Sequence, residues 1–219
     1  MIKKAVLPVA GLGTRFLPAS KATPKEMLPI IDKPLLQYAV EEAIEIGVEE
    51  IIFITSTDKH SIEKHFQENI DMANRLIKSG KEDYLEKLNP KVFSDIKFHY
   101  INQNKQNGLG DAVLHAKDIV GDDSFAVLLP DDLFFSDISC LSQLVDTYKK
   151  TNSSVIAVNK IDKENIHKYG VINPGIKEHD AILIEDIIEK PKANEAPSDI
   201  AVCGRYIFTS LIFDHLEAT

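Results

Sequence analysis

The stretch AVLPVAGLG, residues 5–13, is a short apolar run that leads directly into a glycine-rich turn. Comparable apolar runs recur at residues 51–54 (IIFI) and 125–129 (FAVLL). Between the first two runs, apolar residues repeat at helical spacing: Leu36, Ala39, Val40, Ala43 and Ile44. Short apolar strands that alternate with amphipathic helices are typical of a parallel sheet covered on both faces. The sequence therefore predicts an α/β fold with a mostly parallel central sheet flanked by helices.

The second half of the chain shows a different pattern. Short strands without long helices between them are expected at residues 154–158, 170–172, 182–188 and 201–208. This pattern predicts a mixed or antiparallel extension of the same sheet. We therefore expect one domain over residues 1–219, with a self-sufficient first half at 1–136 and a second half at 137–219.

The composition excludes several classes of protein. Of the 219 residues, 25 are Lys or Arg and 34 are Asp or Glu, which gives a net charge of −9. This balance argues against a nucleic-acid partner, because such proteins usually present a basic face. We see no apolar run of the roughly 20 residues that a membrane span requires, and no signal peptide. The two cysteines, Cys140 and Cys203, have no zinc-binding spacing. We expect a cytoplasmic protein without nucleic-acid or membrane partners.

Three polar or glycine-rich segments lie at strand ends: residues 11–15 and 131–132 after apolar runs, and residues 103–110 after an alternating strand expected at 96–101. Ligands of open α/β sheets bind at the carboxyl ends of the strands. These three segments are therefore expected to line one ligand-binding crevice.

The first segment has the chemistry of a phosphate site. It is not a dinucleotide fingerprint, because Phe16 stands where that motif has its last glycine, and it contains no P-loop. Its glycines allow the backbone to approach phosphates closely, and Arg15, Lys21 and Lys25 supply positive charge. The alternative is a plain turn between a strand and a helix, with solvated cations.

The other segments carry groups that suit a nucleotide, a metal and a sugar phosphate. The amide of Gln103 offers both a donor and an acceptor, which suits the imide edge of a pyrimidine. Asp131 and Asp132 end a buried strand, and Mg²⁺ prefers one or two carboxylates with phosphate and water oxygens. Glu189 and Lys190 have the chemistry to bind a sugar hydroxyl and a phosphate. The alternatives are a solvated loop, a turn that begins with Asp and a surface ion pair.

Taken together, these segments resemble the sugar-1-phosphate nucleotidyltransferases, and among them the bacterial UTP–glucose-1-phosphate uridylyltransferases, also called UDP-glucose pyrophosphorylases. The segment PKEMLP at residues 24–29 is more similar to the uridylyl enzymes than to the thymidylyltransferases. The other matching segments run in family order over nearly the whole chain: GLGTR (11–15) with Pro18, DKP (32–34), residues 103–112, LPDD (129–132), KYGV (168–171), EKP (189–191) and GRYI (204–207).

The resemblance implies a fold and a reaction. The fold is a Rossmann-like nucleotidyltransferase fold, with the nucleotide bound by residues 1–136 and the sugar phosphate by an extension at 137–219. In the implied reaction, UTP and glucose 1-phosphate give UDP-glucose and pyrophosphate, reversibly, with Mg²⁺ as cofactor and without a covalent intermediate. The resemblance also implies a homodimer or homotetramer for the full-length protein.

The resemblance further implies a role for each matching residue. The expected catalytic residues are Arg15 on the leaving pyrophosphate, Lys25 near the reacting phosphates, Asp131 on Mg²⁺ and Lys190 on the phosphate of glucose 1-phosphate. The expected nucleotide-binding residues are Ala10, Gly11, Gly13, Thr14, Glu26, Gln103 and Gly108, of which Ala10, Gly11, Gln103 and Gly108 would hold the uridine. The expected sugar-phosphate residues are Gly170, Glu189, Lys190 and Val202.

Some alternatives stay open at this point. A thymidylyltransferase, another nucleotide-sugar pyrophosphorylase and a non-catalytic nucleotide-sugar-binding regulator would share these motifs, and the sequence does not fix the base or the sugar. The family continues beyond the segment that residues 205–219 resemble, with a second metal-binding aspartate. We therefore expect a C-terminally truncated chain in which Leu211, Ile212 and Leu216 lack a partner surface. The scattered histidines receive no role: His60, His65, His99, His115, His167, His179 and His215.

Overall fold

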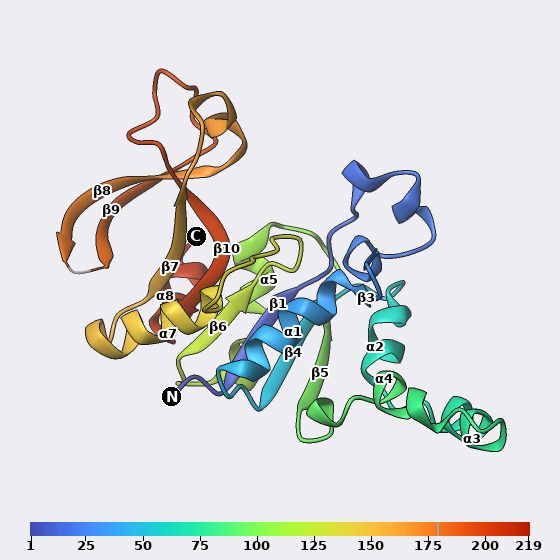
Figure 1. Ribbon diagram of the computed structural model, residues 1–219. Helices are drawn as coiled ribbons and strands as arrows, with labels where there is room; N and C mark the ends of the chain where they lie inside the picture. Colours follow the sequence, from blue (N-terminus) through green and yellow to red (C-terminus); the bar gives the residue numbers. More distant parts are fainter. Residues whose placement is uncertain (179) are drawn as a thin grey trace.

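One mixed sheet runs through both halves of the molecule (Figure 1). In the computed structural model, which describes residues 1–178 and 180–219, the strand order is β5-β4-β1-β6-β10-β8-β9, and β7 also pairs with β10. His179 lies outside the described residues. The strands of this sheet are β1 (Lys4–Pro8), β4 (Glu50–Thr55), β5 (Lys97–Asn102), β6 (Phe125–Leu128), β7 (Val155–Lys160), β8 (Gly170–Glu178), β9 (Ala181–Glu189) and β10 (Ile200–Phe208). A separate hairpin is formed by β2 (Pro29–Ile30) and β3 (Lys33–Pro34).

The helices are short. The α-helices are α1 (Leu35–Glu45), α2 (His60–Phe66), α3 (Ile70–Lys78), α4 (Leu85–Leu88), α5 (Leu109–Leu114), α6 (Lys117–Val120), α7 (Cys140–Thr151) and α8 (Leu211–Glu217). The 3₁₀ turns are η1 (Thr14–Phe16), η2 (Ala19–Lys21), η3 (Lys25–Met27), η4 (Glu82–Tyr84), η5 (Lys91–Phe93) and η6 (Lys163–Lys168). Among the described residues, no helix has the length and apolar content that a bilayer crossing requires.

The first half of the sheet is parallel, as its apolar runs predict. Strand β1 pairs in parallel with β4 on one side and with β6 on the other, and β5 joins β4. Helices α1, α2 and α7 pack on one face, and α5, α6 and α8 pack on the other. Strand residues such as Leu7, Ile52 and Val127 are fully buried. The runs are continuously apolar because both faces of these strands lie in the core.

The second half is the antiparallel extension that the sequence predicts. Strand β10 runs antiparallel to β6, β7 and β8, and β8 and β9 form a hairpin. The hairpin strands extend to Glu178 and begin at Ala181, so they are longer than expected. Because β10 pairs with both β6 and β8, it joins the two halves in one sheet.

The expectation for the last helix is wrong for two of its three apolar residues. Ile212 and Leu216 pack against the cluster formed by β6, α5 and α6. Phe213 in the same helix stacks on Phe125 with ring centroids 5.2 Å apart. Only Leu211 of the three stays exposed, at 65%. Helix α8 therefore completes one face of the core.

Candidate active site

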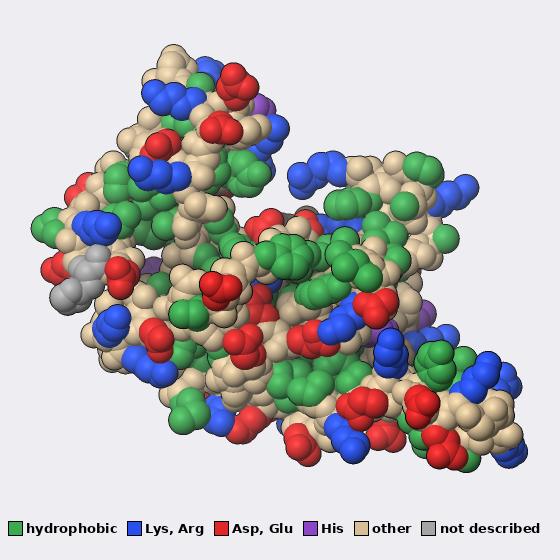
Figure 2. Space-filling model, in the orientation of Figure 1, with side chains coloured by type: hydrophobic (Ala, Val, Ile, Leu, Met, Phe, Trp, Pro, Cys, Tyr) green, Lys and Arg blue, Asp and Glu red, His purple; other side chains and the backbone are tan. Residues whose placement is uncertain are grey.

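The predicted ligand segments meet at one edge of the sheet. Residues 11–15 follow β1, residues 103–110 follow β5 and residues 131–132 follow β6. These strands are parallel, so their carboxyl ends lie on the same side. Figure 2 shows a hollow there, between the lobe that carries β8 and β9 and the projecting segment that carries η1, η2 and η3. Figure 1 places the two parts on opposite sides of the sheet edge.

The glycine-rich loop is built around the backbone of Gly13. This residue has a φ of +64° and begins η1, the turn that carries Thr14 and Arg15. A Cβ at Gly13 would lie 3.1 Å from Lys25 Cβ and 3.3 Å from Ser20 Cβ. The Ser20 hydroxyl also donates to the Gly13 carbonyl at 2.7 Å. Glycine is needed here both for the backbone conformation and for the approach of Lys25.

An ion pair joins two of the predicted catalytic residues. Lys25 Nζ lies 2.6 Å from Asp131 Oδ2, although the two residues are 106 positions apart in the chain. Lys25 stands on η3 and Asp131 follows β6. Arg15 is exposed on η1, in the turn that follows the glycine-rich loop. The structure thus brings a cation and a carboxylate together where a phosphate and its counter-ion are expected.

The two adjacent aspartates have different environments. Asp132 Oδ2 accepts a hydrogen bond from the Gly204 backbone N–H at 2.8 Å, so this carboxylate fastens the loop to β10. Asp131 is exposed and has Lys25 as its ion-pair partner. Among the described residues, no three His, Cys, Asp or Glu side chains form a metal-binding group. The single carboxylate of Asp131 fits a Mg²⁺ ion that takes its other ligands from phosphates and water.

The second loop is tied to the first. Gln103 is buried, and its amide nitrogen donates to Asp111 Oδ2 at 2.6 Å, which orients the amide. Gln106 Nε2 donates to the Ala10 carbonyl at 2.7 Å and links the two loops. Gly108 has a φ of +107° and precedes α5. The four residues expected at the uridine therefore lie on two loops that contact each other.

The predicted sugar-phosphate residues also come together. Gly170 on β8 lies directly opposite Glu189 on β9. A Cβ at Gly170 would lie 3.1 Å from Glu189 Oε2 and 3.8 Å from Val202 Cγ2 on β10. Lys190 has a φ of +47°, which a side-chain-bearing residue rarely adopts. Its backbone N–H donates to the Tyr169 carbonyl at 3.0 Å, and its ammonium lies 2.9 Å from Glu189 Oε1.

Two buried cations hold the loops from the protein interior. No role was assigned to either of them from the sequence. Lys59 contacts the carbonyl oxygens of the glycine-rich loop and the carboxylate of Glu26, which is 1% exposed. Arg205 is also 1% exposed. Its Nε and Nη2 lie 2.9 and 2.8 Å from Glu42 Oε2, and its Nη1 donates to the Leu129 carbonyl at 2.9 Å. No motif around Lys59 marked it, and Arg205 stood in a matching segment without a function.

Burial also shifts the pKa values of two side chains on β10, Cys203 and Tyr206, near the loop that carries Asp132. It raises the pKa of the Cys203 thiol, and it raises the pKa of the Tyr206 hydroxyl to about 12; the negative charge of Asp132 acts in the same direction on both. Both groups therefore stay neutral at physiological pH. A nucleophile or base at this position is not expected from either side chain.

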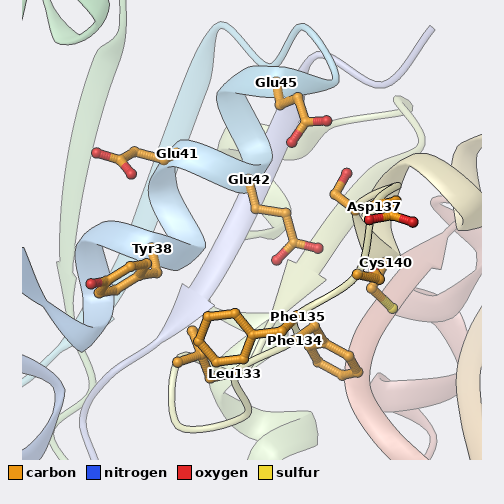
Figure 3. A pocket seen from close by; sticks show the side chains of 11 residues that line it. Tyr38, Glu41, Glu42, Glu45, Leu133, Phe134, Phe135, Asp137 and Cys140 are labelled. Atoms are coloured by element: carbon orange, nitrogen blue, oxygen red, sulfur yellow. The ribbon is translucent and has the colours of Figure 1, made fainter. Parts of the chain in front are cut away.

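A pocket of about 280 Å³ lies between helix α1 and residues 133–140 (Figure 3). Helix α1 contributes Glu42 and Glu45 to it, and the segment before α7 contributes Phe134 and Phe135. The guanidinium of Arg205 lies 4.8 Å from the centre of the Phe134 ring. Four carboxylates line this pocket, those of Glu41, Glu42, Glu45 and Asp137, and their negative charge does not suit the phosphates of a nucleotide.

Comparison with known proteins gives consistent matches. A family model described as nucleotidyl transferase matches residues 4–219. A UTP–glucose-1-phosphate uridylyltransferase of Staphylococcus epidermidis is 48% identical over 217 residues, which are 99% of this chain and 75% of that protein. A UTP-bound UDP-glucose pyrophosphorylase of Acinetobacter baumannii is similar in structure, with a TM-score of 0.93, 40% identity, and coverage of 100% of this chain and 78% of that one. A UDP-glucose pyrophosphorylase complexed with UDP-glucose gives a TM-score of 0.87 and 41% identity, with 100% and 80% covered.

Proposed function

This chain belongs to the nucleotidyl transferase family, and from that premise we propose that it makes UDP-glucose and pyrophosphate from UTP and glucose 1-phosphate. The resemblance seen in the sequence is thereby confirmed. The observation that carries the proposal is the Lys25–Asp131 ion pair at the carboxyl end of the sheet, with the predicted uridine and sugar residues beside it. The similar proteins are named for UTP and UDP-glucose, which selects these substrates.

The nucleotide binds along the first two loops. The Gln103 amide faces the imide edge of the uracil, because Asp111 takes one of its N–H groups and leaves its other N–H and its oxygen for the base. The backbone of Ala10, Gly11 and Gly108 completes the uridine site. Gly13 and Thr14 place the turn on which Arg15 reaches the β- and γ-phosphates. Glu26 supports this loop from the interior through Lys59.

The phosphates meet positive charge from two sides. Lys25 lies near the α-phosphate and Arg15 contacts the departing pyrophosphate, so charge is neutralised where it accumulates. Asp131 would hold Mg²⁺, which, when bound, screens the phosphate charges and helps to orient them. Asp132 keeps its hydrogen bond from the Gly204 N–H and so fixes the loop that carries Asp131.

Residues 137–219 bind glucose 1-phosphate, whose phosphate is the nucleophile. Glu189 accepts hydrogen bonds from hydroxyl groups of glucose, Gly170 leaves room for the ring and Val202 lines the wall. Lys190 binds the phosphate and leaves Glu189 for the sugar. Both ligands are then oriented in one hollow, which converts a reaction between two polyanions into a step within one complex.

The reaction balances without a protein base. A phosphate oxygen of glucose 1-phosphate attacks the α-phosphorus of UTP and forms one new P–O bond. The bond from the α-phosphorus to the bridging oxygen breaks, and its electron pair leaves with pyrophosphate. The attacking oxygen is already an anion, so no proton must be removed and no histidine is required.

The test measures pyrophosphate release from every pairing of UTP or dTTP with glucose 1-phosphate or galactose 1-phosphate. Lys25→Met should abolish release, and Lys117→Met, which breaks the exposed Lys117–Glu217 ion pair, serves as the matched control. Release with UTP and glucose 1-phosphate alone supports the proposal. Preference for dTTP would identify a thymidylyltransferase, and nucleotide-sugar binding without release would identify a regulator.

We further propose that the protein acts in the cytoplasm as a homo-oligomer. Cys140 and Cys203 are free thiols, which suits a reducing compartment. Large apolar side chains such as Phe135 and Ile138, exposed at 82% and 61%, are available for contacts between copies. Light scattering at several protein concentrations measures the oligomeric state, and a monomer at all of them would contradict this second proposal.

A further inference from the structure

We propose that Lys59 is a positioning residue for the nucleotide: its buried ammonium holds the glycine-rich loop from behind, so that the amide N–H groups of the loop face the ligand. This proposal rests on the function proposed above and adds to it a residue that touches no substrate. Lys59 immediately precedes α2, on the interior side of the loop, and is only 8% exposed.

The ammonium of Lys59 is fully used inside the protein. It donates to the carbonyl oxygen of Val9, to that of Gly11 at 2.7 Å and to Glu26 Oε2 at 3.0 Å. A lysine ammonium has three N–H donors, so these three acceptors saturate it. It therefore has no donor left for a phosphate, and its effect on a ligand must pass through the groups that it holds.

Those contacts fix the orientation of two peptide planes. In a trans peptide the C=O and the N–H of the following residue point in opposite directions. Because the carbonyls of Val9 and Gly11 point toward Lys59, the N–H groups of Ala10 and Leu12 point away from it. In the part of the chain that the structure describes, neither N–H has a hydrogen-bond acceptor. Neighbouring free N–H groups at a glycine turn suit a carbonyl or phosphate oxygen of a nucleotide.

The same contact also places the turn that carries Lys25. Glu26 stands next to Lys25 on η3, and its carboxylate is buried against Lys59. Its other oxygen, Oε1, is buried without a hydrogen-bond partner among the described residues. Lys59 thus provides the charge compensation for Glu26, and through Glu26 it sets the direction from which Lys25 reaches Asp131.

A double substitution distinguishes this proposal from the alternative that Lys59 and Glu26 form an ion pair with a purely structural role. Lys59→Met removes the donors but leaves Glu26 as a buried unpaired charge, which destabilises the fold for a reason unrelated to the ligand. Lys59→Met with Glu26→Gln removes that charge as well. We expect the double variant to recover most of the melting temperature that Lys59→Met loses, yet to keep weak nucleotide binding.

Calorimetric titration with UTP and steady-state kinetics with glucose 1-phosphate give the readout. In the double variant the Kd for UTP should rise at least tenfold, while the KM for glucose 1-phosphate changes less than twofold. Lys117→Met is the control, because its ion pair with Glu217 lies on α6 and α8, outside the site. A double variant with normal stability and wild-type UTP affinity would overturn the proposal, and so would equal weakening of both substrates.

A measurement on the unmodified protein covers the case in which the double variant does not fold. Hydrogen–deuterium exchange at the amide of Leu12, a residue that is 70% exposed, should be fast without ligand and should slow at least tenfold with UTP, but not with glucose 1-phosphate. Unchanged exchange with UTP would refute the predicted orientation of this N–H group. A wild-type protein that binds no UTP would instead overturn the proposed function, and this proposal with it.

Discussion

Replacing Gly13 with alanine tests the geometry of the glycine-rich loop. The backbone there has a φ of +64°, and an L-residue in this conformation costs about 1–2 kcal/mol. The new methyl group would also lie 3.1 Å from Lys25 Cβ and 3.3 Å from Lys25 Cγ. Crowding of this kind typically adds about 1–3 kcal/mol. The expected loss in the free energy of unfolding is therefore about 2–5 kcal/mol.

Gly47→Ala is the matched control. Gly47 has a φ of +87° at the end of α1, but a Cβ there would meet no atom within 4 Å. It carries the backbone cost without the crowding, so its loss should stay at about 1–2 kcal/mol. For a protein of this size each kcal/mol lowers the melting temperature by roughly 2–4 °C. Thermal unfolding of the two variants should therefore give clearly separated midpoints.

The two variants should differ still more in activity. In Gly13→Ala the methyl group displaces Lys25, and a shift of about 1 Å in a group that positions substrate can cost 10²-fold in rate. We expect kcat/KM for UTP to fall by about 10- to 100-fold, and Gly47→Ala to stay within about twofold of the wild type, because Gly47 lies outside the site. Equal midpoints and equal kcat/KM values in the two variants would refute the argument that Gly13 makes room for Lys25.

Three further changes have defined outcomes. Asp131→Asn should lower turnover by orders of magnitude with little change in melting temperature, since the carboxylate is exposed; wild-type turnover at ordinary Mg²⁺ would show that Asp131 does not hold the metal. Lys190→Ala should weaken glucose 1-phosphate binding by about 1.5–3 kcal/mol and UTP binding much less, as measured by calorimetry; equal losses would remove Lys190 from the sugar-phosphate site. Burial raises the pKa of the Cys140 thiol to about 12, so in a Cys203→Ser background iodoacetamide should label it much more slowly in the folded than in the denatured protein; equal labelling rates would contradict the burial.

The parts of the fold that the sequence predicts best are those with a strong local signal. Apolar runs such as residues 51–54 predict parallel strands, because only a strand covered on both faces is apolar at every position. The position of the ligand loops follows from the same topology, since parallel strands carry them all to one edge. In the β8–β9 hairpin the register shifts near Pro174 and much of the surface is exposed, so the pattern there predicts shorter strands than the structure has.

The burial and the partners of the two cations, Lys59 and Arg205, could not be predicted from the sequence. Lys59 stands in a polar stretch, STDKH, which has the composition of a surface turn. Its partners Val9, Gly11 and Glu26 lie 50, 48 and 33 positions away, so its role exists only in the folded chain. The same holds for Arg205, whose partner Glu42 is 163 positions away. A charged residue is predicted to be exposed unless its partner is known.

The contacts of Arg205 also bear on whether the first half is self-sufficient. Strand β6, which carries the aspartate loop, has β1 on one side and β10 on the other. The Leu129 backbone is held at both its N–H and its C=O by Gly204 and Arg205, and Asp132 is held by Gly204. Without residues 137–219, β6 would become an apolar edge strand and the loop would lose these bonds. The expectation that residues 1–136 fold by themselves stays a prediction, and these contacts argue against it, because the strand that lines the sugar site also sets the position of Asp131.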